Sequence, residues 1–153
     1  MSFKIIFTAG LAALTLPALV EAQMTIENAY ARSSGPMAQS GAAFMTITNS
    51  GDADDRVTGV LSDAAERVEL HTHIGDENGV MRMRPALDGF PVAAGATHML
   101  QRGGDHVMFM GLAAPWRDGG EVIVTLLFEY AAPMVLRIPI DQVRPPISGS
   151  ASD

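Results

Sequence analysis

Length, composition and charge already narrow the class of protein. The chain has 153 residues, enough for one domain and too few for two of ordinary size. Hydrophobic residues make up 48% and charged residues 18%, a balance that excludes a disordered or fibrous protein. The net charge of −7, without any basic run, argues against nucleic-acid binding. The absence of cysteine excludes disulfides, thiol redox chemistry and Cys-ligated zinc.

Residues 1–22 have the pattern of a secretory signal peptide. Lys4 precedes an apolar run over residues 5–20, and the small-x-small end Val20-Glu21-Ala22 closes it. A membrane anchor is the alternative, but the run is shorter than the roughly 20 residues that a span needs, and Pro17 disfavours a continuous helix. We therefore expect cleavage after Ala22 and an exported protein without stable membrane insertion.

The rest of the chain has the pattern of short strands separated by turns. The predicted strands cover residues 26–31, 43–48, 57–60, 68–73, 80–84, 98–100, 106–112, 121–130 and 134–140. Clusters of Gly, Pro, Asn, Asp and Ser separate them, and residues 61–66 are expected to form at most one helical turn. This pattern predicts an all-β antiparallel sandwich or barrel over residues 23–144. The small, polar residues 145–153 are expected to form a flexible C-terminal tail.

Two groups of histidine and methionine stand out among the four His and ten Met residues of the chain. The first consists of His71-Thr72-His73, at the end of one predicted strand, and Met81-Arg82-Met83, which follows an Asp-Glu-Asn-Gly turn. The second is His106-Val107-Met108-Phe109-Met110. Because side chains alternate along a strand, the His and both Met residues of the second group should share one face.

Imidazole and thioether groups together suit a soft metal ion of low charge, and Cu(I) is the leading candidate. Zinc ranks behind because it favours Cys, His or carboxylate ligands, and no EF-hand spacing indicates calcium or magnesium. Methionine also has an advantage in an oxidising compartment, since it cannot close into a disulfide. Because the thioether is neutral, it releases no proton when a metal ion binds.

A structural role is the other interpretation of these residue types. Methionine commonly fills irregular cores, and we expect Met45, Met99 and Met134 to be core residues. His98 is expected to be a hydrogen-bonded structural histidine. For the two His–Met groups, the residue pattern by itself leaves metal binding and packing equally open.

At these groups the chain resembles the PCuAC family of periplasmic copper chaperones. The family motif is a His, a later Met and then a His-x-Met, and His71, Met83 and His106-Val107-Met108 fit it. The two gaps hold 11 and 22 residues, one more than usual in each, and both contain turns, where an extra residue is easily absorbed. The flanking residues 41–47, 68–71, 79–85 and 106–112 also match, and the resemblance covers residues 26–140.

The resemblance implies a cupredoxin-like, Greek-key antiparallel β-sandwich that binds one Cu(I) ion at an exposed edge. The implied metal ligands are His71, Met83, His106 and Met108. Many family members have a Met where this chain has His73, which would be a supplementary ligand and would favour Cu(II) as well. The chain lacks the His- and Met-rich tail of some members, so no second copper site is expected.

In terms of function, the resemblance implies a non-enzymatic metallochaperone in the periplasm. It would carry copper toward the copper centres of cytochrome c oxidase, either to an oxidase subunit or to another copper chaperone. We expect a monomer that binds no nucleic acid. A blue-copper electron-transfer protein needs a Cys ligand, and the chain has neither a Gly-x-Ser-x-Gly nor an HExxH motif typical of enzymes. The alternative is a periplasmic scaffold or adhesion domain in which the His and Met residues are incidental.

Overall fold

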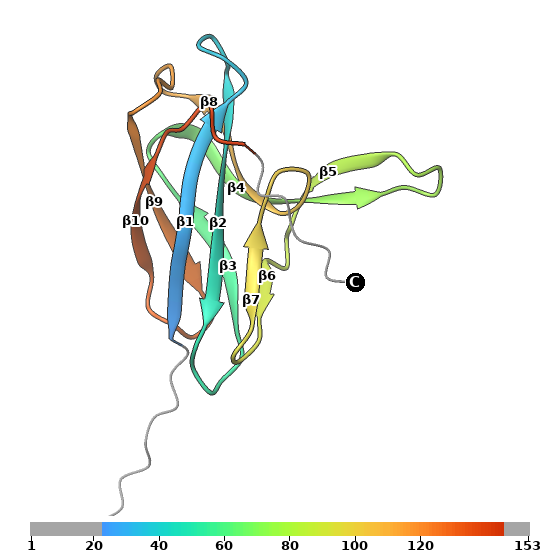
Figure 1. Cartoon of the computed structure of the whole chain (residues 1–153). Coiled ribbons are helices and arrows are strands. Elements are labelled where there is room, and N and C mark those ends of the chain that lie inside the picture. Colours follow the sequence, from blue (N-terminus) through green and yellow to red (C-terminus); the bar gives the residue numbers. More distant parts are fainter. Residues whose placement is uncertain (1–22, 146–153) are drawn as a thin grey trace, which may run out of the picture.

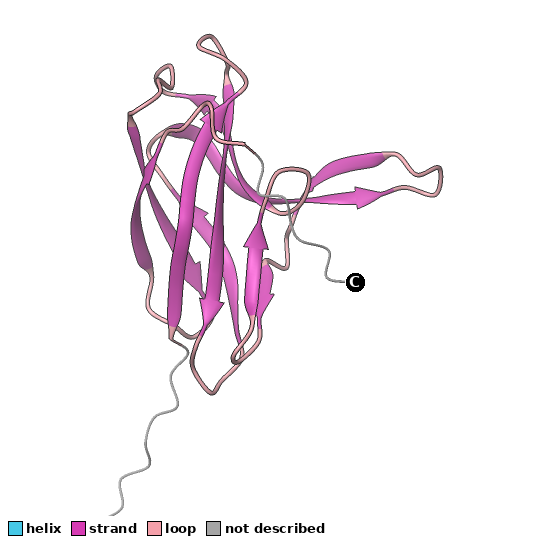
Figure 2. Cartoon of the chain, in the orientation of Figure 1, coloured by secondary structure: helices cyan, strands magenta, loops and turns pink. Residues whose placement is uncertain are grey.

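The computed structural model describes residues 23–145, which form ten β-strands (Figure 1). The strands are β1 (Met24–Ser33), β2 (Ser40–Asn49), β3 (Asp55–Leu61), β4 (Ala65–Gly75), β5 (Met81–Pro85), β6 (Phe90–Val92), β7 (Thr97–Leu100), β8 (His106–Leu112), β9 (Glu121–Phe128) and β10 (Met134–Pro139). Figure 2 shows strands and loops only, so this part of the chain has no helix long and apolar enough to cross a membrane. The expected signal peptide and residues 146–153 of the expected tail lie outside the described residues.

The strands form two antiparallel sheets that pack face to face. The larger sheet has the order β1-β2-β8-β4-β5, with β7 also paired to β2, and the smaller sheet has the order β10-β9-β3-β6. The predicted all-β antiparallel architecture is therefore confirmed, and it is a sandwich and not a barrel. The sequence analysis missed β6, because three residues with a central proline carry too weak a strand signal.

The core between the sheets follows the alternation of each strand. In β8, Val107 and Phe109 are fully buried, whereas Met108 between them faces away from the core. Trp116 packs edge-on against Phe109, with 5.0 Å between ring centroids. Its ring lies directly over Gly41, where an added Cβ would come within 2.3 Å of the indole. Only glycine therefore fits at this position of β2.

Two of the three expected core methionines are placed differently from the prediction. Met45 is buried at 1% exposure, as predicted. The prediction for Met99 is wrong, because it pairs with Thr46 on the outer face of the larger sheet and is 39% exposed. Met134, at the start of β10, is half-buried.

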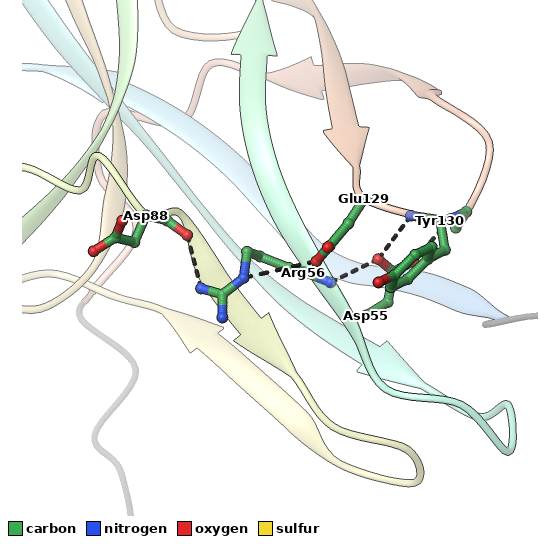
Figure 3. Close-up of polar contacts among 6 residues, drawn as sticks. Asp55, Arg56, Asp88, Glu129 and Tyr130 are labelled. Carbon is green, nitrogen blue, oxygen red and sulfur yellow. Dashed lines mark hydrogen bonds and ion pairs between the residues drawn. The ribbon is translucent and has the colours of Figure 1, made fainter.

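A buried carboxylate fixes the smaller sheet (Figure 3). Asp55, at the start of β3, is 4% exposed. Its carboxylate accepts hydrogen bonds from the backbone N–H groups of Arg56, Tyr130 and Ala131 at 2.7, 3.0 and 2.8 Å. The Arg56 guanidinium donates to the carbonyl of Asp88 at 2.7 Å. These bonds attach the β9–β10 turn and the segment before β6 to β3, away from the His and Met residues of the larger sheet.

Candidate metal centre

The register of the larger sheet brings the predicted ligands to one face. His71 of β4 and His106 of β8 are direct cross-strand partners, and His73 of β4 is the partner of Met83 of β5. Met108 follows His106 by two residues and therefore points the same way. This is the outer face of the sheet, since Val107, which lies between them, points into the core. The ring centroid of His106 lies 5.8 Å from that of His71 and 5.4 Å from that of His73.

A shallow groove of about 390 Å³ opens over this face. His73, Met83, His106 and Met108 all line it, with Phe44 beside His106. His71 does not line the groove, because it lies deeper and is only 7% exposed. The structure thus places three of the four predicted ligands and the supplementary ligand at the surface of the groove, with His71 buried next to His106.

Each of the three imidazoles has one nitrogen engaged and one left as a possible donor to metal. His73 and His106 each place Nδ1 at 2.9 Å from the carbonyl of Gly104. His71 places Nε2 at 3.0 Å from a carboxylate oxygen of Glu69. Because a carbonyl and a carboxylate only accept, these nitrogens carry the hydrogen, and the opposite nitrogen of each neutral ring has a lone pair. Metal-binding histidines commonly donate their second N–H in this way.

His71 carries the most informative atom of the site. Its Nδ1 is buried and has no hydrogen-bond partner within the described residues. A buried polar atom without a partner costs about 1–3 kcal/mol, and a metal ion bound at this lone pair would remove that cost. The donor chemistry of the site therefore fits a metal ion that accepts imidazole and thioether ligands.

The surroundings of His106 favour the neutral form of its imidazole. Burial lowers the pKa of His106, and the nearby His73 and His71 lower it further, although the Gly104 carbonyl acts in the opposite direction. The pKa of Glu69 is also lowered, chiefly by its hydrogen bond with His71. Histidine binds a metal ion as the neutral imidazole, so the burial of His106 favours the form that binds metal.

The two thioethers are more accessible than His71 and His106. All residues of β5 are exposed, and Met83 is 46% exposed. Figure 1 shows that the β4–β5 hairpin, which carries Met83, extends away from the body of the sandwich. Met108 is half-buried. The histidines are therefore held by the sheet and its hydrogen bonds, whereas the thioethers lie at the open side.

The remaining histidine and one neighbouring methionine have other contacts. His98 places Nε2 at 2.9 Å from Asp105 and stacks on Phe90, which confirms its predicted structural role. The sulfur of Met110 accepts a hydrogen bond from Arg67 at 3.5 Å. Within residues 23–145, no three His, Cys, Asp or Glu side chains by themselves form a group that could hold a metal ion, so a metal ion in this groove would need the methionine sulfurs beside the histidines.

Sequence analysis missed the groups that orient the imidazoles. Gly104 belongs to the Gly-Gly-Asp turn before His106, where its only visible signal was that of a turn. Glu69 precedes His71 by two residues, so the alternation of a strand places both on one face. That alternation was a signal that could have identified Glu69.

Comparisons with known proteins agree with this fold. A family model described as "Putative lipoprotein LpqE-like" matches residues 24–140. The chain is 37% identical over 99 residues to "Putative lipoprotein Lxx21020" of Leifsonia xyli subsp. xyli, strain CTCB07. The matched part is 65% of this chain and 59% of that protein, so the chain covers less than two thirds of this relative's length.

Among solved structures, the copper-bound PCuAC domain from PmoF2 is 21% identical with a TM-score of 0.64, and the match covers 80% of this chain and 95% of that domain. The solution structure of CuI-DR1885 from Deinococcus radiodurans is 28% identical with a TM-score of 0.62, covering 82% of this chain and 83% of that one. The expected cupredoxin-like β-sandwich is thereby confirmed.

Proposed function

Since the chain belongs to the LpqE-like family and folds like PCuAC domains, we propose that it is a non-enzymatic copper chaperone of the PCuAC type. The observation that carries this proposal is the set of three imidazoles on one sheet face, each with one nitrogen tied to an acceptor and the other left as a donor. One of these donors, Nδ1 of His71, is buried without a partner. Two thioethers flank the same groove.

The copper ligands in this proposal are His71, Met83, His106 and Met108. His71 would bind through Nδ1 and His106 through Nε2, because their other nitrogens donate to Glu69 and Gly104. Two of the four groups are soft, uncharged sulfur donors and the other two are imidazoles, so Cu(I) is the oxidation state that they favour. The two thioethers release no proton when copper binds, whereas the two histidines bind as neutral imidazoles.

His73 is the supplementary ligand in the same proposal. It lines the groove opposite Met83 and shares the Gly104 acceptor with His106. Replacing a thioether by this imidazole would give a donor set better suited to Cu(II). The chain would then hold copper in either oxidation state by exchanging a thioether for His73.

Delivery would proceed by ligand exchange at the open side of the groove. Met83 and Met108 are the accessible and weaker donors, so an acceptor's donor atoms would displace them before the buried histidines. The acceptor would be a cytochrome c oxidase subunit or another copper chaperone in the periplasm. Export through cleavage after Ala22 would place the domain, residues 23–144, in that compartment, and the lipoprotein name of the family supports an envelope location.

The test is a Cu(I) titration of residues 23–153 against a competing chelator. The site variant is His106→Ala/Met108→Ala, and the matched control is His98→Ala/Met99→Ala, which removes the same side-chain types from β7. We expect one tightly bound Cu(I) per chain for the wild type and the control, and loss of tight binding for the site variant. Equal, weak binding by all three proteins would overturn the proposal and favour a scaffold domain with incidental His and Met.

A further inference from the structure

The groove over the candidate ligands is positively charged, although the protein as a whole is acidic. Arg32 of β1 and Arg102 of the β7–β8 loop both line it. No Asp or Glu lines this groove, whereas the whole chain carries a net charge of −7. The two arginines come from segments far apart in the sequence, so the fold brings them to the groove.

These two arginines have no polar partner among the described residues. Four other arginines form ion pairs with carboxylates: Arg56, Arg67, Arg82 and Arg137. Within residues 23–145, no ion pair and no side-chain hydrogen bond involves Arg32 or Arg102. Arg102 is exposed and Arg32 is half-buried. Their guanidinium groups are therefore free to bind an external anion.

The groove combines two kinds of chemistry. It is lined by the imidazole and thioether donors and also by Arg32 and Arg102, together with Ser34 and Ser40. A guanidinium offers planar, paired N–H donors that match a carboxylate. The geometry points to an acidic protein segment as the occupant: we propose that the copper acceptor docks here through Asp or Glu residues next to its own copper donors. This inference rests on the proposed function and adds the charge of the partner to it.

Bound copper strengthens this recognition. Because a thioether carries no charge and histidine binds a metal ion as the neutral imidazole, the copper-bound site carries the full positive charge of one Cu(I) beside Arg32 and Arg102. The Debye length is about 8 Å at physiological ionic strength, so charges within one groove still act together on a docked segment. The loaded groove attracts an acidic segment more strongly than the emptied one, and the complex weakens once copper has left. A second copy of this chain is a poor occupant, because both copies carry a charge of −7.

The experiment measures the rate of Cu(I) transfer from residues 23–153 to two synthetic peptides under anaerobic conditions. The peptides share one Met- and His-containing copper-binding core and carry a fluorophore that Cu(I) quenches. One core is flanked by glutamates and the other by glutamines. The variant is Arg32→Gln/Arg102→Gln, and the control is Arg56→Gln/Arg137→Gln, which removes the same charge from β3 and β10 of the other sheet. Each protein is first titrated with Cu(I) to establish its affinity.

We expect the wild type and the control to transfer copper faster to the glutamate peptide, by roughly three- to tenfold at low salt. The Arg32→Gln/Arg102→Gln protein should lose this preference while keeping its Cu(I) affinity. In the wild type and the control, 0.5 M salt should abolish the preference. The docking inference would be overturned if the wild type transferred copper at equal rates to both peptides, or if both double variants lost the preference for the glutamate peptide equally. Neither result would count against copper binding. If the wild type binds no Cu(I) in the titration, it is the proposed function that fails.

Discussion

Removing the carboxylate of Glu69 should weaken copper binding without removing a ligand. Glu69 accepts the Nε2 hydrogen of His71 at 3.0 Å, which fixes the tautomer that presents Nδ1 as the metal donor. In Glu69→Ala this acceptor is lost, and His71 can place its hydrogen on either nitrogen. Loss of such an orienting partner typically costs 10–100-fold in metal affinity.

The structure indicates an effect at the lower end of that range. The Glu69 side chain is 35% exposed and also lies 3.4 Å from Arg67, so water screens part of its interaction with His71. We therefore expect a loss of about tenfold in Cu(I) affinity, which corresponds to roughly 1.4 kcal/mol. Glu69→Gln should lose less, because its amide oxygen can still accept the hydrogen bond.

The assay is a Cu(I) competition titration of Glu69→Ala, Glu69→Gln and the control Glu66→Gln. Glu66 lies on the same strand and is exposed, so this control makes the same change of charge away from His71. Nitrogen chemical shifts of the His71 ring report the tautomer directly. Wild-type affinity in Glu69→Ala, or an unchanged tautomer of His71, would refute the argument that Glu69 prepares this ligand.

Three further predictions concern stability, pH and oxidation. Asp55→Ala removes a buried carboxylate that accepts from two partly buried N–H groups. It should lower the free energy of unfolding in urea titrations by about 2–4 kcal/mol without changing Cu(I) affinity, and wild-type stability would contradict this. Because burial places the pKa of His106 below its ordinary value, the unfolded chain binds more protons as pH falls through about 6.5. The free energy of unfolding should therefore decrease there, and His106→Gln should reduce this dependence; an identical pH profile in the variant would count against it. Peroxide should weaken Cu(I) binding because sulfoxide at Met83 or Met108 is a poor soft donor, and unchanged affinity after oxidation confirmed by mass spectrometry would argue against both as ligands.

The strands and the donor types can be predicted from the sequence because they depend on neighbours along the chain. Alternation within His106-Val107-Met108 determines that imidazole and thioether share the face opposite the core. The Asp-Glu-Asn-Gly turn predicts that Met81-Arg82-Met83 begins the strand that follows His73, and the register then makes Met83 the direct partner of His73. Met99 and β6 show the limit of local patterns, because exposure and pairing there depend on which strand lies alongside.

Only the tertiary structure determines how these local pieces meet. β8 lies between β2 and β4, its non-consecutive neighbours, and this pairing sets His106 opposite His71. The same arrangement brings His73 and His106 within hydrogen-bond distance of the Gly104 carbonyl and leaves Nδ1 of His71 buried without a partner among the described residues. It also brings Arg32 and Arg102 to one groove. Contacts between distant segments depend on the packing of both sheets around one core, and no local period in the sequence encodes that packing.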